Sequence, residues 1–437
     1  MVDAEARPAA LAVLHAGRTE VRLVAVSPRG RILSWRQAPN AIKTGEPYPH
    51  CDVAHIERWL MAALRDLGER FAIEAVVPTA YGSTAALIDD EGELVLPVMD
   101  YESPRPAEVA AAYAEVAPWF EECFCPIDAG GLTLGRQLFW QSRTFPEPFA
   151  RARWILPFPQ YWAWRLSGVA ASEVTSLGAR TQLWSPRAQD FSSLARQQGW
   201  VERFPPLRKA WSILGPLKPD VAVRARLRAD TPVLCGIHER AAGLARYLAG
   251  GAGDFALISG GPCLEACNPG RPLERLDPLR DVAASVDLEG RPVACARLMD
   301  AQAYDEIAGE PDLSDVRELL RRGEALSPLA RAAQARLHVA LIASAGLDLL
   351  QADERVIIEG NLVEPALVPA LLAALRPGQK VLVSGEREVA ATGAALLWGW
   401  PERRETPPLA LKAIEPPGLP GLEAYAARWR AAAEAPP

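Results

Sequence analysis

One arrangement of strands and glycine turns occurs twice along the chain, and it constrains the fold more than any other feature of the sequence. The first copy covers residues 11–30 and turns at Gly17, and the second covers residues 255–270 and turns at 260–262. In both, a glycine turn separates two apolar runs, and a turn containing proline and glycine follows, which is typical of short consecutive strands. A repeated layout indicates duplicated architecture. We therefore expect two related domains with a boundary near residue 230.

Helical patterns alternate with these strands. Residues 56–67 carry apolar side chains at helical spacing, and the apolar run at 73–79 predicts a buried strand after this helix. Strands on both sides of a helix indicate layers of helices on sheets, which is the α/β class. Further strands are expected at 84–88, 232–235, 356–358 and 381–384, and further helices at 158–166, 240–248, 329–349, 366–375 and 390–398.

The composition is that of a globular protein. Of 437 residues, 49% are apolar and 23% are charged, which excludes disordered, collagenous and membrane classes. The net charge is −7 at pH 7 and no run of Lys or Arg occurs, so nucleic acid is not expected as a partner. The longest apolar stretch, residues 339–350, is shorter than the roughly 20 residues that span a bilayer. Seven cysteines without CxxC spacing argue against disulfides and structural zinc and favour a reducing cytoplasm.

Common nucleotide and hydrolase signatures are absent from the sequence. It contains no GxxxxGK[ST], GxGxxG, GxSxG or HExxH motif. Gly17, Arg18 and Thr19 instead place a turn glycine, a cation and a hydroxyl in one loop. Backbone N–H groups at a tight turn can form an anion nest without lysine, although such a turn is also common in ordinary hairpins. Two such turns, one in each half, favour a nucleotide bound between two domains.

Seven segments, in their order and spacing, carry a family resemblance. They are 11–23 (LAVLHAGRTEVRL), 45–52 (GEPYPHCD), 76–87 (VVPTAYGSTAAL), 135–140 (GRQLFW), 157–181 (PFPQYWAWRLSGVAASEVTSLGART), 232–242 (PVLCGIHERAA) and 391–397 (ATGAALL). Together they resemble the FGGY-type carbohydrate kinases of the actin–hexokinase superfamily, close to the fuculokinase and rhamnulokinase branch. The resemblance extends over nearly the whole chain.

This resemblance implies two RNase H-like domains around an interdomain cleft. Residues 1–230 would bind the sugar and carry the first phosphate turn, and residues 231–437 would carry the catalytic segment, the second phosphate turn and the adenosine side. The implied reaction is ATP-dependent phosphorylation of a hydroxyl group on a small sugar, such as a deoxy-ketose, with ATP and Mg²⁺ as cofactors. Such phosphoryl transfer needs positioning, charge neutralisation and one base. The expected partners are the sugar and ATP, in the cytoplasm, and a homodimer is left open.

The family's functional positions carry over residue by residue. Glu239 stands at the position of the catalytic base. The sugar-binding positions are occupied by Tyr81, Glu173, His238 and Arg240. The phosphate- and ATP-binding positions are occupied by Gly17, Arg18, Thr19, Ser259, Gly260, Gly261, Gly360, Asn361 and Gly393. For Gly393, close packing between helices is the alternative interpretation.

Several of these positions depart from the family pattern. The Asp of the first phosphate turn is replaced by His15, a poor partner for the oxygen-seeking Mg²⁺, so no metal ligand is assigned. The catalytic Asp is replaced by Glu239, whose extra methylene moves its oxygen by more than about 1 Å. Gly261 and Pro262 lose a threonine hydroxyl and a backbone N–H, and Tyr81 stands where His is common.

These departures leave a second interpretation open. In it the chain is a catalytically impaired pseudokinase that binds a sugar or a nucleotide, or regulates a partner. Arg240 or Arg18 is then expected to hold the Glu239 carboxylate, because a neighbouring cation lowers the basicity of a carboxylate.

Overall fold

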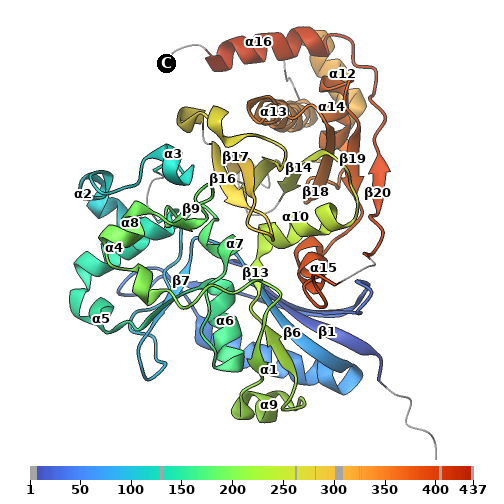
Figure 1. The fold of residues 1–437 in the computed structure, drawn as a ribbon. Helices are drawn as coiled ribbons and strands as arrows, with labels where there is room; N and C mark the ends of the chain where they lie inside the picture. Colours follow the sequence, from blue (N-terminus) through green and yellow to red (C-terminus); the bar gives the residue numbers. More distant parts are fainter. Residues whose placement is uncertain are drawn as a thin grey trace, which may run out of the picture. The chain divides into compact units, whose positions relative to one another are not determined.

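The structure is a computed structural model, and it describes residues 7–127, 131–260, 263–280, 282–300, 309–323, 325, 327–402 and 406–434 (Figure 1). The chain divides into two compact units, each built from segments that are separate in sequence. Unit 1 consists of residues 1–251, 284–292 and 388–408, and unit 2 of residues 252–283, 293–387 and 409–437. These two units are compact groups of segments, whereas the boundary expected near residue 230 would separate two related domains of a family. That boundary stays a prediction.

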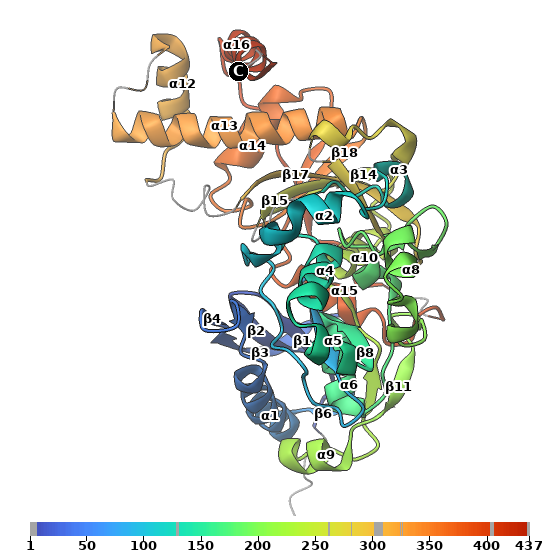
Figure 2. The same ribbon diagram turned by 90° about the vertical axis from the view of Figure 1, so that its left-hand side faces the viewer.

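Unit 1 is built on a seven-stranded mixed sheet (Figures 1 and 2). Strands β1 and β2 form an antiparallel hairpin, whereas β6 runs parallel to β1, β12 and β13. The carboxyl ends of β1, β6 and β13 therefore lie at one edge of this sheet. The strands are β11 (Ile213–Pro216), β12 (Pro232–Leu234), β6 (Ala72–Ala80), β1 (Ala9–Ala16), β2 (Glu20–Val26) and β3 (Ile32–Pro39) in spatial order, with β13 (Ile237–His238) also paired to β6.

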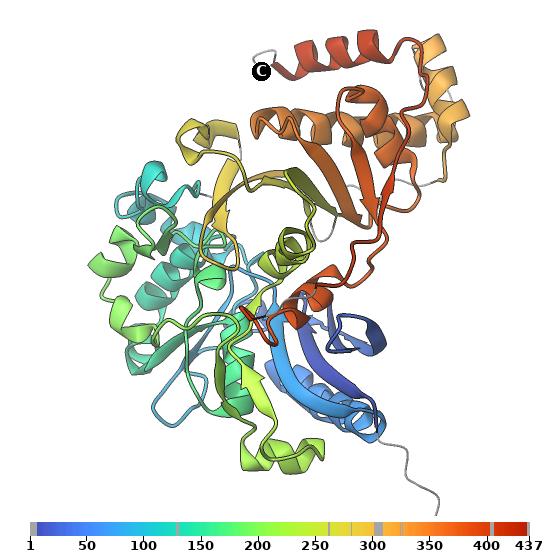
Figure 3. The same cartoon turned by 45° about the vertical axis from the view of Figure 1, so that its right-hand side comes forward.

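The side chains of β1 alternate between two cores, as expected for a strand that has helices on both faces. Ala12 and Leu14 belong to one core together with α1 (Val53–Arg70) and α6 (Phe158–Ser167). Leu11 and Val13 belong to the other core, together with α10 (Glu239–Ala249) and α15 (Val389–Ala395), two helices that lie side by side (Figure 3). All four β1 side chains are fully buried. This explains why the strand reads as a continuous apolar run.

The helices begin and end at residues that satisfy their terminal backbone groups. The side chain of Asp52 accepts a hydrogen bond from the N–H of His55 at the start of α1, as N-cap residues do. Gly168 ends α6 in the left-handed conformation, with φ of +78°, which glycine adopts without a Cβ clash. These signals are local in sequence, and the expected helices at 56–67 and 158–166 are confirmed.

The chain between β6 and β12 adds a helical layer to unit 1. Its core contains Leu87, Leu138, Leu183 and Trp184. The elements of this layer and of the neighbouring loops are β4 (Ile42–Lys43), β5 (His50–Cys51), β7 (Ala85–Ile88), η1 (Arg105–Val109), α2 (Ala110–Ala114), α3 (Phe120–Cys123), α4 (Leu134–Thr144), α5 (Pro146–Arg151), β8 (Trp154–Pro157), α7 (Val174–Leu177), β9 (Trp184–Ser185), β10 (Asp190–Phe191), α8 (Ser193–Gln197), η2 (Val201–Arg203) and α9 (Pro219–Ala225).

A second seven-stranded sheet supplies the core of unit 2. Its order is β16 (Val282–Val286), β17 (Pro292–Asp300), β15 (Cys263–Asn268), β14 (Phe255–Gly260), β18 (Arg355–Gly360), β19 (Val381–Ser384) and β20 (Leu411–Ala413). The long helix α13 (Pro328–Leu349) lies against α14 (Leu367–Leu375) (Figure 2). The other helices of the unit in the described part of the chain are η3 (Leu273–Arg275), η4 (Pro278–Arg280), α12 (Leu313–Arg322) and α16 (Leu422–Glu434).

The repeated layout inferred from the sequence is confirmed in both sheets. In each sheet an antiparallel hairpin, β1–β2 or β14–β15, has its first strand paired in parallel with a strand that follows a long helix. That strand is β6 after α1 and β18 after α13. Gly261 and Pro262, at the turn of the second hairpin, lie outside the described residues. Among the helices that are described, none is long and apolar enough to cross a membrane.

Candidate active site

Glu239, the expected catalytic base, meets His15 at the carboxyl edge of the unit 1 sheet. His15 lies near the end of β1, opposite Thr79 of β6, and His238 ends β13 opposite Ala80. Glu239 is the next residue and begins α10. Its Oε2 atom lies 2.7 Å from Nε2 of His15, and the two side chains are 19% and 21% exposed. The register of β1 and β13 on β6 thus brings together two residues that are 224 positions apart.

The two side chains form a hydrogen-bonded pair, which is an ion pair when His15 is protonated. Burial alone would lower the pKa of His15, but the hydrogen bond to Glu239 and the charges of Glu239 and Glu388 raise this pKa above 6.5 overall. Burial would raise the pKa of Glu239, but the hydrogen bond from His15 and the charges of His15, His238 and Arg240 lower it below 4.5 overall. A carboxylate with a lowered pKa is a weaker base. The side chain that we identify as the hydrogen-bonding partner of Glu239 is thus the imidazole of His15 and not an arginine.

The ion pair predicts a pH-dependent contribution to stability. Because the pKa of His15 is raised on folding, its contribution is complete below its unfolded value of 6.5 and is lost as the pH rises through the higher folded value. Because the pKa of Glu239 is lowered, its contribution is present above 4.5 and is lost as the pH falls through the lower folded value. A double-mutant cycle of His15→Gln and Glu239→Gln, followed by urea unfolding, should show the largest coupling between about pH 4.5 and 6.5. Coupling that stays constant from pH 4 to pH 9 would contradict the ion pair.

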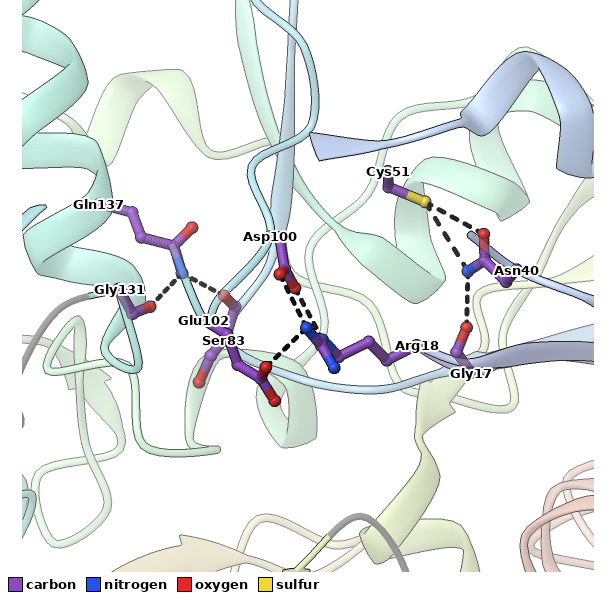
Figure 4. A network of polar contacts seen from close by, with 9 residues as sticks. All are labelled: Gly17, Arg18, Asn40, Cys51, Ser83, Asp100, Glu102, Gly131 and Gln137. Carbon is purple, nitrogen blue, oxygen red and sulfur yellow. Dashed lines mark hydrogen bonds and ion pairs between the residues drawn. The ribbon is translucent and has the colours of Figure 1, made fainter. Parts of the chain in front are cut away.

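The guanidinium group of Arg18 is held by two carboxylates (Figure 4). Its Nε and Nη2 atoms donate to Oδ1 and Oδ2 of Asp100 at 2.8 and 2.9 Å, and Nη2 lies 2.6 Å from Oε2 of Glu102. The bond to Asp100 is the main cause of the raised pKa of Arg18. The expectation that Arg18 holds Glu239 is therefore wrong, because the buried Asp100 offers two acceptors in the geometry of the guanidinium fork. Phosphate binding by Arg18 stays a prediction, and the bonds to Asp100 and Glu102 engage its Nε and Nη2 atoms.

Asn40 holds the turn at Gly17, which the sequence predicts as the first phosphate turn. The Nδ2 atom of this buried side chain donates to the carbonyl oxygen of Gly17 at 2.7 Å (Figure 4), and its backbone N–H donates to the carbonyl oxygen of Thr19 at 2.9 Å. A Cβ atom on Gly17 would overlap the carbonyl oxygen of Glu20, so the turn requires glycine. Asn40 was not identified from the sequence, because it lies in a loop that only the tertiary structure brings to Gly17.

Tyr81 is buried at the carboxyl edge of the unit 1 sheet, directly after β6. It is 4% exposed, and its ring packs edge-on against Tyr101 and Phe158, with centroid distances of 5.6 and 5.2 Å. Burial raises the pKa of its phenol well above 10, so the hydroxyl keeps its proton. The next residue, Gly82, leaves room for the imidazole of His238, which a Cβ atom there would overlap. Sugar contact by Tyr81 stays a prediction.

His238 and Glu173 have local structural partners. Nδ1 of His238 accepts a hydrogen bond from the N–H of Arg240 at 3.3 Å and caps α10. Burial is the main cause that lowers the pKa of His238 to about 4, so its ring is neutral. Glu173 has no exposed surface and caps α7. These placements favour supporting roles for both residues, and the direct sugar contacts expected for His238, Arg240 and Glu173 stay predictions.

Gln137 of α4 supports the loop after β6. Its Nε2 atom donates to the carbonyl oxygens of Ser83 and Gly131 at 2.6 and 2.5 Å (Figure 4). Ser83 has φ of +52°, a conformation that is uncommon outside glycine and that the surrounding structure must hold in place. Gln137 was also missed from the sequence. The signal that points to it is a glutamine directly before the apolar run 138–140, in the segment 135–140 that resembles the family.

In unit 2, four of the predicted ATP-binding residues lie at the ends of β14 and β18. Ser259 pairs with Glu359 and Gly260 with Gly360 in the parallel register, and Oγ of Ser259 donates to Oε1 of Glu359 at 2.7 Å. The N–H of Asn361 bonds to the carbonyl oxygen of Gly260. Gly360 has φ of +79°, and a Cβ atom on it would overlap Gly260. The structure thus brings Ser259, Gly260, Gly360 and Asn361 together, whereas Gly261 lies outside the described residues.

Gly393 lies in unit 1, on α15. A Cβ atom on it would overlap the carbonyl oxygen of Ala242 on α10. Close helix packing therefore explains this glycine, and its contact with ATP stays a prediction.

The residues at the first turn do not suit a magnesium ion. Mg²⁺ takes oxygen ligands in near-octahedral geometry, whereas the position expected to orient it carries the imidazole of His15, already bonded to Glu239. Among the described residues, no three His, Cys, Asp or Glu side chains form a group that could hold a metal ion. The described residues of this turn therefore do not offer the oxygen ligands that a magnesium ion prefers.

Two family profiles match the chain. The FGGY family of carbohydrate kinases, N-terminal domain, matches residues 11–245, and the carbohydrate kinase FGGY, C-terminal domain, matches residues 315–407. Among curated proteins, the chain is similar to L-fuculokinase of Escherichia coli (strain K12) and of Salmonella typhi, each at 25% identity over 52% of this chain. The chain spans about half the length of these curated relatives, because the match covers 50% of each.

The solved structures extend the likeness to nearly the full length. A carbohydrate kinase from Novosphingobium aromaticivorans is 30% identical, with a TM-score of 0.86 over 98% of this chain and 99% of that one. A ligand-bound xylulose kinase from Lactobacillus acidophilus is 11% identical, with a TM-score of 0.80 over 97% and 96%, and this likeness shows the fold alone. The predicted fold class, α/β with two sheets of the actin–hexokinase type, is confirmed.

Proposed function

Because the chain belongs to the FGGY family of carbohydrate kinases, we propose that it transfers the γ-phosphoryl group of ATP to a hydroxyl group of a small sugar. The observation that carries this proposal is the position of Glu239. Its carboxylate lies at the carboxyl edge of the unit 1 sheet, at the start of α10, and keeps 19% of its surface exposed. Ligands of open α/β sheets bind at such an edge.

In the proposed reaction, the hydroxyl oxygen of the sugar attacks the γ-phosphorus, ADP leaves, and the hydroxyl proton passes to a carboxylate oxygen of Glu239. The ion pair with His15 weakens this base. Phosphoryl transfer tolerates a weak base, because its loose transition state depends mainly on positioning and on charge stabilisation. FGGY kinases generally use a divalent metal with ATP, which would supply charge neutralisation at the phosphates when bound.

We infer the remaining assignments from the same family membership. The sugar is of the deoxy-ketose type and binds in the N-terminal half, at Tyr81 and its neighbours. ATP contacts the turn at Gly17 and Thr19 and the residues at the ends of β14 and β18. A cytoplasmic location and a homodimer are further expectations that solution experiments can address.

A coupled assay of ADP release over a panel of ketoses and deoxy-ketoses tests this function. Sugar-dependent ADP release, above the rate with ATP alone, is the expected result. A thermal-shift screen run in parallel detects binding, because a ligand at 100 times its Kd stabilises the folded state by about 2.7 kcal/mol.

A specific observation favours a second function, that of a catalytically silent sugar- or nucleotide-binding protein. The proposed base is paired with His15, and the cation of the first phosphate turn is held by Asp100 and Glu102. Both groups are thus engaged within the protein. Thermal stabilisation by a sugar or by ATP, without ADP release on any sugar of the panel, would support this second function over the first.

His15→Asp should raise the affinity for Mg-ATP by about tenfold, the lower end of the range for residues that orient metal ligands. The reason is that the substitution restores a carboxylate that can accept hydrogen bonds from metal-bound water and releases Glu239 from its ion pair. Calorimetric titration with Mg-ATP measures the change. His55→Asp, which makes the same change of side chain on α1, is the control. Equal affinities of His15→Asp and the wild type would show that position 15 does not act on the metal.

A further inference from the structure

Glu173 is a buried carboxyl group that the proposed reaction does not use. It has no exposed surface, and burial raises its pKa to about 7, although hydrogen bonds from Thr175 and Ser176 oppose the rise. Its Oε2 atom accepts bonds from Oγ1 of Thr175 at 2.5 Å and from the N–H of Ser176 at 3.2 Å. Its Oε1 atom has no hydrogen-bond partner among the described residues. Burying a carboxyl group is costly, so its position calls for a physical reason.

The Thr175 hydroxyl connects this carboxyl group to the catalytic segment. While Oγ1 donates its proton to Glu173, it accepts a hydrogen bond from the backbone N–H of His238 at 3.0 Å. A hydroxyl group has a single proton, so when Glu173 is ionised and accepts this proton in a hydrogen bond, the oxygen lone pairs of Thr175 face His238. The bond crosses from α7 to the last residue of β13.

His238 is the residue before Glu239, and it is the N-cap of α10. Its N–H therefore lies at the point where β13 ends and the helix that carries Glu239 begins. β13 is a short strand, and in the described residues it pairs with β6 at Ile237 and His238. An additional bond to the backbone at this point restricts the direction in which Glu239 leaves the sheet.

We propose that Glu173 is a positioning residue for Glu239: through Thr175 it fixes the backbone of His238 and thereby the distance between Glu239 and His15. The effect on turnover rests on the proposed kinase function, whereas the effect on the His15–Glu239 pair does not. A displacement of a catalytic group by about 1 Å can cost 10²-fold in rate. The role of Glu173 in fixing the distance between Glu239 and His15 thus accounts for the burial of its carboxyl group.

The test compares Thr175→Val with Thr175→Ser. Valine keeps the shape of threonine and removes both hydrogen bonds, and serine keeps the hydroxyl group. The readout is the pKa of His15, measured from the imidazole C–H resonances in an NMR titration of the full chain, which has five histidines. The pKa of His15 is expected to fall toward 6.5 in Thr175→Val, because the ion pair loosens, and to keep the wild-type value in Thr175→Ser. Glu173→Gln should shift it in the same direction by a smaller amount, since the amide oxygen is a weaker acceptor than a carboxylate.

A His15 pKa that is equal in the wild type, Thr175→Val and Glu173→Gln, with all three folded by circular dichroism, would overturn the proposal. Should Thr175→Val fail to fold, Glu173→Gln carries the same decision. Turnover supplies a second reading: kcat on an accepted sugar should fall by tenfold or more in Thr175→Val while KM changes little, and it should be restored in Thr175→Ser. If the wild type turns over no sugar, the kinase function fails, and the NMR titration still decides the role of Glu173.

Discussion

Glu239→Gln is expected to lower kcat on the accepted sugar by a factor of about 10²–10⁴, the usual contribution of a general base. The amide keeps the shape of the carboxylate and its carbonyl can still accept a hydrogen bond from His15, but it cannot take the proton of the sugar hydroxyl. Affinity for the sugar should therefore stay nearly unchanged. The coupled assay gives kcat, and calorimetric titration with the same sugar gives its Kd.

Glu57→Gln is the matched control for this substitution. Glu57 is also an ion-paired glutamate of unit 1, bonded to Arg165 and Arg224, and it lies on α1. Its replacement should leave kcat unchanged. Glu239→Asp should retain or raise kcat, since aspartate matches the length usual for the family. Equal rates of the wild type and Glu239→Gln on every sugar would end the case for Glu239 as a general base.

Gly393→Ala is expected to lower the free energy of unfolding by about 2–3 kcal/mol. Alanine is the better helix former by about 1 kcal/mol, but its Cβ atom would overlap the carbonyl group of Ala242. A backbone group of a packed helix cannot rotate away as a side chain can, so α15 and α10 must separate. Urea unfolding measures the loss.

Gly45→Ala is the control, because a Cβ atom on Gly45 meets no atom within 4 Å. Its stability should stay within about 0.5 kcal/mol of the wild type. If Gly393→Ala were as stable as Gly45→Ala and yet bound ATP more weakly, the packing explanation of Gly393 would be wrong, and the nucleotide interpretation would replace it.

Much of the fold was predictable because its signals are local. The strand at 11–14 is a continuous apolar run, since both faces of the unit 1 sheet are covered. Helix ends were marked by residues with a local role, such as Gly168. The duplication was visible because each copy places a glycine between two strands at a position where the backbone has little room.

The candidate site was predictable only in part, because its decisive contacts join distant segments. His15 and Glu239 were each singled out, but their pairing depends on the register of two strands on a third. Under the pseudokinase interpretation, the sequence offered Arg240 or Arg18 as the partner of Glu239. In the structure, His15 of β1 forms the hydrogen bond to Glu239, and Arg18 bonds Asp100. Asp100 lies in a loop, where no periodic sequence pattern marks a contact residue.

Strand β6 acts as the common reference for the site, because Thr79 lies opposite both His15 of β1 and Ile237 of β13. The chain leaves β6 after residue 80 and returns beside it with β12 at residue 232, and the register of β1 and β13 on β6 decides that His15 and Glu239 meet, whatever the length of the chain between. Insertions and deletions in that intervening stretch cost little in loop entropy. In evolution, the layer that would select a substrate can therefore diversify while His15 and Glu239 stay paired.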